Sequence, residues 1–249
     1  MIMTSAYLLV SHGSRDPRPQ VAMEQLAEFL SAQLGHGKHL VGIAALELQP
    51  RPLHQQIKDF ASIAVLHGVK SLEIVPLFLL PGVHVMADIP EQIALAQEAL
   101  GEDIIIRQHP HLGSHRNLVT LLSQEMATME AQTTILLAHG SRRPGSLEPI
   151  ETIAGQLGAV TAYWAVAPSL ESRIQDLVAT GQTKVAILPY FLFTGGITDA
   201  IAQSLERLKL QFPTVTFQLA APLGASRELA EIIGDLLTSP LVETQGILN

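Results

Sequence analysis

The sequence contains no cysteine among its 249 residues. Disulfide bonds, iron–sulfur clusters, thiolate zinc sites and cysteine nucleophiles are therefore excluded, because each of them needs a thiol. Any transition metal must be bound by imidazole, carboxylate or backbone oxygen. Imidazole is abundant, since the chain has ten histidines.

Positive charge and long apolar runs are also scarce. Fifteen Lys and Arg residues stand against 23 Asp and Glu residues, and no basic cluster with interleaved aromatics marks a nucleic-acid surface. No apolar run reaches the roughly 18 residues of a membrane span, and residues 1–5 lack the features of a signal peptide. We therefore expect neither a nucleic acid nor a membrane as partner, and a cytoplasmic location.

Short β-rich runs alternate with segments of helical period along the chain. Apolar residues at i, i+4, i+7 and i+11 from Leu53 and from Ile89 predict amphipathic helices. The intervening runs are apolar at nearly every position, which is typical of parallel strands covered on both faces. The predicted strands are Tyr7–Val10, Leu40–Ala44, Leu72–Val75, Ile104–Ile106, Thr134–Ala138, Val160–Ala165, Val185–Leu188 and Val215–Leu219.

An internal repeat divides these elements into two sets of four strands. The segments Leu8–Arg15, Pro76–Gly82 and Leu112–Leu118 return in the same order as Leu136–Arg142, Pro189–Gly195 and Leu223–Leu229. We therefore predict an α/β protein of two tandem Rossmann-like domains, each a four-stranded parallel sheet flanked by helices. The predicted domains are residues 1–131, which carry the active site, and residues 132–249, which form a degenerate copy.

Three potential metal ligands occur only in the first repeat at the ends of predicted strands. His12 follows the first strand, Glu47 ends the second, and His84 lies in the loop after the third. Because ligands of parallel sheets bind beyond the carboxyl ends of the strands, the three should converge. Two imidazoles and a carboxylate suit Fe²⁺, Co²⁺, Ni²⁺ or Zn²⁺, and they can accept protons near neutral pH.

Structural interpretations of these residues stay open at this point. His12 can bond to its own turn, Glu47 can be a solvated charge at a strand end, and His84 can be an ordinary loop histidine. His139 is the counterpart of His12 in the second repeat, as a vestigial ligand or as a residue that holds its own loop. After the fourth predicted strand, a denser group of histidines is expected at the surface, with a supporting role near the site as the alternative: His109, His111 and His115.

The turn after the first strand also has features of an anion site. Gly13 and Ser14 offer backbone N–H groups and a hydroxyl at the start of a helix, and Arg15 and Arg18 add positive charge. The second repeat carries the same pattern at Ser141, Arg142 and Arg143. Neither nucleotide motif, GxGxxG or GxxxxGK[ST], is present.

The motifs Leu9–Arg15 and Pro76–His84, with Glu47 before Pro50 and Pro52 and with Asp88 after His84, resemble the class II chelatases. The closest likeness within them is to sirohydrochlorin chelatases of the long, duplicated type. The resemblance implies insertion of Co²⁺ or Fe²⁺, with Ni²⁺ as a further candidate, into a sirohydrochlorin-type tetrapyrrole for cobalamin or siroheme synthesis.

The resemblance also assigns roles. His12, Glu47 and His84 would bind the metal and assist removal of the pyrrole protons, and the metal would be a substrate rather than a cofactor. No iron–sulfur cluster is expected, because cysteine is lacking. Since sirohydrochlorin is an octacarboxylate, Ser14, Arg15 and Gly82 are the expected substrate-side residues, and the duplication favours a monomer. Two alternatives are a metal or tetrapyrrole carrier without turnover and a phosphoryl-handling enzyme that uses the turn at His12–Arg15.

Overall fold

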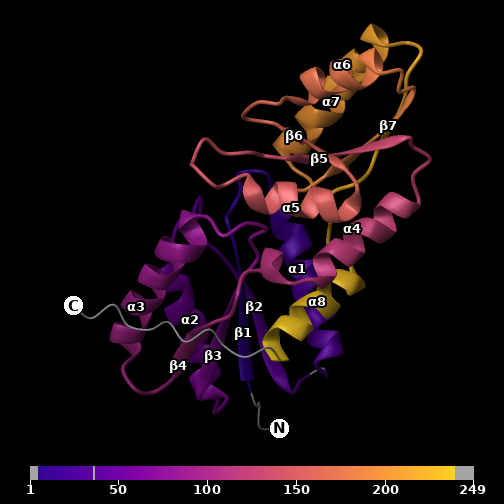
Figure 1. The fold of residues 1–249 in the computed structure, drawn as a ribbon. Helices are drawn as coiled ribbons and strands as arrows, with labels where there is room; N and C mark the ends of the chain where they lie inside the picture. Colours follow the sequence, from indigo (N-terminus) through magenta and orange to yellow (C-terminus); the bar gives the residue numbers. More distant parts are fainter. Residues whose placement is uncertain (1–4, 36, 239–249) are drawn as a thin grey trace. The chain divides into compact units, whose positions relative to one another are not determined.

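The computed structural model, which describes residues 5–35 and 37–238, contains two four-stranded parallel sheets (Figure 1). The first sheet has the order β2-β1-β3-β4 and the second has the equivalent order β6-β5-β7-β8. The predicted α/β fold with two repeated sheets is confirmed. The strands are β1 Ser5–Ser11, β2 His39–Ala45, β3 Ser71–Pro76, β4 Ile105–Gln108, β5 Thr133–Ala138, β6 Val160–Tyr163, β7 Lys184–Pro189 and β8 Thr216–Leu219.

Helices connect successive strands, as parallel pairing requires. In the first repeat they are α1 Pro17–Gln33, α2 Leu53–Leu66, α3 Ile89–Leu100 and α4 Asn117–Ala127. A π-helical turn, η1 His84–Asp88, precedes α3, and a 3₁₀ turn, η2 Leu112–Ser114, precedes α4. The second repeat contributes α5 Glu148–Leu157, α6 Leu170–Ala179, α7 Gly196–Gln211 and α8 Arg227–Thr238.

The core of the first sheet explains the helical period of the sequence. Helix α2 buries Leu53 and Ile57, and α3 buries Ile89 and Ala96, against strand residues such as Ile74. Helices α2 and α3 cover one face of this sheet, and α1, which packs against α8, lies over the other (Figure 1). In the second sheet, α6 and α7 bury their apolar residues against β5 and β7.

The compact units of the structure do not follow the repeat along their whole length. One unit combines residues up to 115 with residues 225–238, so α8 belongs to the first sheet. The other unit spans residues 116–224 and therefore includes α4, which packs on α5. The boundary predicted between residues 131 and 132 follows the sequence repeat. As a boundary between domains it stays a prediction.

None of the described helices combines the length and the apolar character that crossing a lipid bilayer demands.

Candidate metal centre

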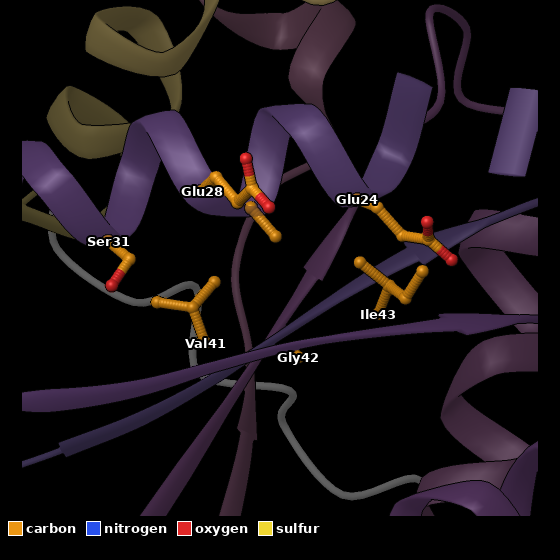
Figure 2. Close-up of a pocket in the computed structure, with 7 residues that line it drawn as sticks. Glu24, Glu28, Ser31, Val41, Gly42 and Ile43 are labelled. Carbon is orange, nitrogen blue, oxygen red and sulfur yellow. The ribbon is translucent and has the colours of Figure 1, made fainter. Parts of the chain in front are cut away.

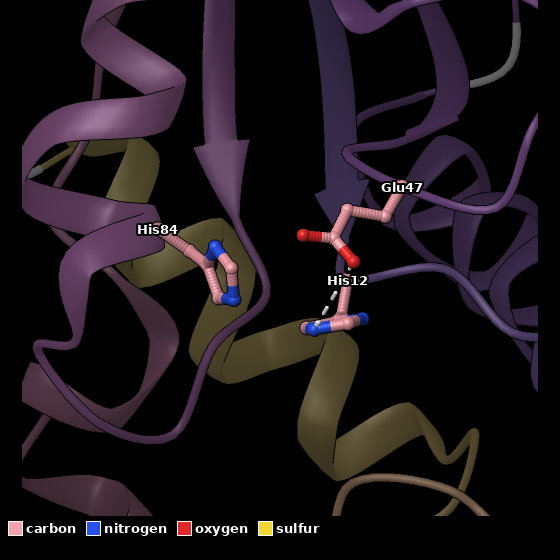
Figure 3. A group of neighbouring side chains, drawn as sticks. All are labelled: His12, Glu47 and His84. Carbon is pink, nitrogen blue, oxygen red and sulfur yellow. Dashed lines mark ion pairs between the residues drawn. The ribbon is translucent and has the colours of Figure 1, made fainter.

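His12, Glu47 and His84 come together at the carboxyl edge of the first sheet (Figure 3). One potential ligand atom from each residue lies within 4.8 Å of those from the other two. The rings of His12 and His84 meet edge to face, with centroids 4.8 Å apart. The predicted convergence is therefore present in the fold, and the donor atoms lie close enough to bind one ion together.

His12 directly follows β1 and presents one ring nitrogen to this cluster. Its Nδ1 lies 3.4 Å from the carbonyl oxygen of Gly13, so Nδ1–H is the donor of that long hydrogen bond. Its Nε2 lies 4.0 Å from Oε2 of Glu47. The structural interpretation of His12, a bond to its own turn, is therefore compatible with metal binding. The bond orients the ring and leaves Nε2 available as a ligand.

Glu47 lies on a short loop that is held from two sides. The N–H of Glu47 donates to the carbonyl of His12 at 2.9 Å, and a Cβ on Gly13, whose φ is +101°, would clash with the Glu47 carbonyl. On the far side, the amide of Gln56 exchanges two hydrogen bonds with Ala45, of 3.1 and 2.9 Å, and donates to the carbonyl of Arg51 at 2.9 Å. The glycine and the glutamine fix the backbone from which the carboxylate projects.

His84 opens the π-helical turn, and Asp88 at its end bonds to it. The carboxylate Oδ2 of Asp88 lies 2.6 Å from Nδ1 of His84. A carboxylate in this position holds the ring with Nδ1–H as donor, which leaves Nε2 available as a ligand atom. The wider π-helical turn, closed by a bond from the Ile89 N–H to the His84 carbonyl, is a form frequently found at functional sites.

The ring of Phe78 lies beside both imidazoles. Its centroid is 6.5 Å from that of His12 and 6.0 Å from that of His84. The Phe78 carbonyl accepts hydrogen bonds from Nδ1 of His111 at 3.0 Å and from the N–H of Gly113 at 2.9 Å. The loop after β4 therefore supports the loop that carries His84.

The expected surface position of the later histidines is wrong for His109 and His111. His109 is only 4% exposed, and its Nε2 lies 3.3 Å from Oε2 of Glu73. Burial raises the pKa of Glu73, but hydrogen bonds from His109 and Ser71 outweigh it, so the pKa lies below its ordinary value. Burial lowers the pKa of His111. Because the residues around them are contributed by β3 and by the 78–80 loop, linear spacing gave no sign of these contacts.

The turn after β1, with Ser14, Arg15 and Arg18, agrees only in part with the anion site expected there. Ser14 is half-buried and accepts a hydrogen bond from the Asp16 N–H at 3.0 Å, whereas Arg15 is exposed. Asp16 caps α1 and forms an ion pair with Arg18 at 2.5 Å, so Arg18 is not the free cation that the sequence indicated. The hydrogen bonds from Arg18 lower the pKa of Asp16 to about 2. This carboxylate takes the place that a phosphate would need at the N-terminus of α1.

Gly82, another expected substrate-side residue, begins the turn that leads into η1. Its carbonyl accepts hydrogen bonds from the N–H groups of Val85 and Met86, each 3.1 Å long. A Cβ at this position would meet no atom within 4 Å. Gly82 therefore lies two residues before His84 in open surroundings.

A cavity lies elsewhere, between α1 and β2 (Figure 2). It has a volume of about 370 Å³ and is lined by Glu24, Glu28, Ser31 and the strand segment Val41–Ile43, with Ala27. It contains no histidine, and its two carboxylates would repel an anionic ligand. The cluster at the carboxyl edge, rather than this cavity, has the chemistry of a metal site.

The cluster is also open to solvent. The side chains of His12, Glu47 and His84 are 51%, 49% and 33% exposed. Three protein donors on one side leave further coordination positions of a bound ion free for another ligand. Fold and site together are those of an α/β protein with a candidate metal centre that is open to a second ligand.

The chain belongs to the CbiX family. The family profile matches it twice, over residues 6–129 and again over residues 133–239. The two matches follow the internal repeat that the sequence shows and together cover most of the chain.

Two curated relatives and one solved structure extend this result. The chain is 27% identical to a sirohydrochlorin cobaltochelatase of Priestia megaterium, over 91% of this chain and 76% of the relative. It is 28% identical to a sirohydrochlorin ferrochelatase of the same organism, over 92% of this chain and 87% of the relative. The structure of SirB from Bacillus subtilis with Fe³⁺ covers 95% of both chains at 25% identity, with a TM-score of 0.76.

Proposed function

We propose that this protein inserts Co²⁺ or Fe²⁺ into sirohydrochlorin. The observation that carries the proposal is the convergence of His12, Glu47 and His84 within 4.8 Å at an open sheet edge. The relatives support it, because two of them are named sirohydrochlorin cobaltochelatase and sirohydrochlorin ferrochelatase. The reaction converts the free tetrapyrrole and M²⁺ to the metal complex and two protons, so it needs a donor set that releases the ion and bases that take the protons.

The three residues meet both needs. Neutral imidazoles of His12 and His84 and the carboxylate of Glu47 bind the ion from one side, and the pyrrole nitrogens approach from the other. As the ion leaves, the same nitrogens and carboxylate oxygen become available to accept the two protons. Because all three side chains are partly exposed, the protons can pass on to water.

The substrate's carboxylates require positive charge from an otherwise acidic protein. We propose that Ser14, Arg15 and Gly82 lie on the substrate side and that Arg15 pairs with a peripheral carboxylate. Arg15 is exposed and follows the His12 turn. Charge-neutralising Arg15→Gln and Arg142→Gln substitutions should raise KM for the tetrapyrrole, and an unchanged KM in both variants would contradict this role.

The decisive experiment mixes the purified protein with sirohydrochlorin and Co²⁺ or Fe²⁺ without oxygen and follows the absorption spectrum. We expect insertion faster than in the protein-free control, and a His12→Ala/His84→Ala variant should lose that acceleration. Binding of both substrates without acceleration would instead indicate a carrier. Ni²⁺, tested in the same assay, shows whether the site discriminates among first-row ions.

We further propose that the chain acts as a monomer in the cytoplasm. The duplication, which supplies two copies of the fold in a single chain, supports the monomer. Light scattering coupled to size-exclusion chromatography tests this, since a dimer would have twice the mass.

A further inference from the structure

Two exposed apolar residues directly adjoin members of the cluster in the sequence. Leu48, which directly follows Glu47, is 50% exposed, and Val83, which directly precedes His84, is 44% exposed. Both therefore stand on the two loops that carry ligands, one on each. Exposed apolar groups gathered next to a binding site are commonly covered when the ligand binds.

The backbone of Leu48 is strained. Its φ is +59°, the only positive value of a non-glycine residue in the described parts of the chain. A bulky L residue adopts this region at a cost, and such strain persists where the surroundings impose it, often at ligand sites. Here the Glu47–His12 hydrogen bond and the bonds from Gln56 impose it from both sides. A glycine would fit this backbone without strain, yet the chain carries a large apolar side chain.

The turn around Val83 contains a natural comparison. Met86 is 69% exposed and lies two residues after His84 in the same π-helical turn. At about 100° per residue, Met86 lies roughly 200° around the helical turn from His84, whereas Val83 lies only about 100° from it. Asp88, four residues after His84, contacts it. Met86 is therefore expected on the side of the turn opposite to His84 and serves as an apolar control.

We infer that Leu48 and Val83 bind the flat apolar face of the tetrapyrrole macrocycle, an inference that rests on the proposed function. The ion must enter the centre of the ring, so the ring face has to lie against the ligand atoms. Apolar groups that adjoin two of these ligands then meet the same face, and the Phe78 ring lies beside both imidazoles. The carboxylates at the ring's periphery stay in water or meet Arg15.

The test compares single variants Leu48→Ser, Val83→Ser and Met86→Ser. Metal-free sirohydrochlorin binding is measured by the change in its absorption, Co²⁺ binding by titration, and insertion by steady-state kinetics. Loss of one buried apolar side chain should raise Kd and KM for the tetrapyrrole about fivefold to twentyfold. Co²⁺ affinity should not change in any variant, and Met86→Ser should behave like the wild type.

A Leu48→Gly variant separates binding from folding. It removes both the side chain and the strain, so its melting temperature should not fall, while its Kd for sirohydrochlorin should rise as in Leu48→Ser. Unchanged Kd in the Leu48 and Val83 variants, or an equal loss in Met86→Ser, would overturn the inference. If the wild type binds sirohydrochlorin without inserting metal, the proposed function fails while the same Kd comparison still decides the contact. If the wild type does not bind it, both fail.

Discussion

The two repeats share a backbone arrangement at the sheet edge but differ in the side chains that it presents. The N–H of Glu47 donates to the His12 carbonyl at 2.9 Å, and in the second repeat the N–H of Ala165 donates to His139 at 2.8 Å. Where the first repeat has His84, the second has Ile197, which is 40% exposed. The backbone arrangement at the strand ends is thus the same in both repeats. Metal binding depends instead on a few side chains that this backbone carries.

The largest effect is expected at His84, a proposed ligand that only the first repeat has. His84→Ala removes a donor and a base, so the rate of metal insertion should fall at least about 100-fold. Ile197→Ala, the matched change in the second repeat, should stay within about twofold of the wild type, since no donor is lost. Initial rates of the absorption change measure both. Comparable losses in the two variants would contradict a functional difference between the repeats.

A smaller loss is expected from the carboxylate behind His84. Asp88→Asn keeps the size of the side chain but weakens its hold on Nδ1, so the affinity for Co²⁺ should fall about 10- to 100-fold. Asp176→Asn removes an exposed carboxylate from α6 and is the control. Titration with Co²⁺ checks this, and an unchanged Kd in Asp88→Asn would show that the hydrogen bond of 2.6 Å does not orient the ligand.

A further test introduces the missing donor side chains into the second repeat. An Ala165→Glu/Ile197→His variant places the missing donors around His139 and should bind a second Co²⁺. This added site should be at least about tenfold weaker than the first, because the position equivalent to Asp88 is the buried Ile201, so no carboxylate would orient the new imidazole. The measurement is the number of Co²⁺ ions bound per chain. If it stays at one, the backbone arrangements of the two repeats differ more than their hydrogen bonds indicate.

The parallel strands and the main cluster were accessible from the sequence for a physical reason. Buried parallel strands are continuous apolar runs, and their carboxyl ends share an edge, so His12, Glu47 and His84 could be placed together without coordinates. The repeat strengthened this prediction, because positions that differ between the copies stand out against those that do not.

The supporting residues were harder to predict. Gln56 and His111 act through backbone carbonyls of other loops, and neither spacing nor composition marks such contacts. The ion pair of Arg18 with Asp16, two residues earlier, was likewise not foreseen. The exchange of α4 and α8 between compact units also has no local signal, since both helices have an ordinary amphipathic pattern. Asp88 is an exception, because the i, i+4 spacing from His84 is visible in the sequence.

The smallest expected effect concerns pH and again separates the repeats. His111 supports the carbonyl of Phe78, whereas its counterpart Pro222 cannot titrate, and the Phe191 carbonyl is bound by the Leu223 N–H instead. Burial lowers the pKa of His111 below its ordinary value of 6.5. As the pH falls through 6.5, the unfolded chain takes up this proton first, so the folded state loses stability until the pH lies below the folded pKa.

His111→Gln should remove this contribution while retaining a donor for the Phe78 carbonyl. Between pH 7.5 and 5.5, the wild type should therefore lose about 1–2 °C more in melting temperature than the variant. Glu73 does not confuse the comparison, because its pKa lies below its ordinary value of 4.5, and its stabilising effect is lost only at more acid pH. Thermal unfolding at both pH values is the measurement. Equal changes of melting temperature in the two proteins would show that the support of the Phe78 carbonyl does not depend on a neutral imidazole.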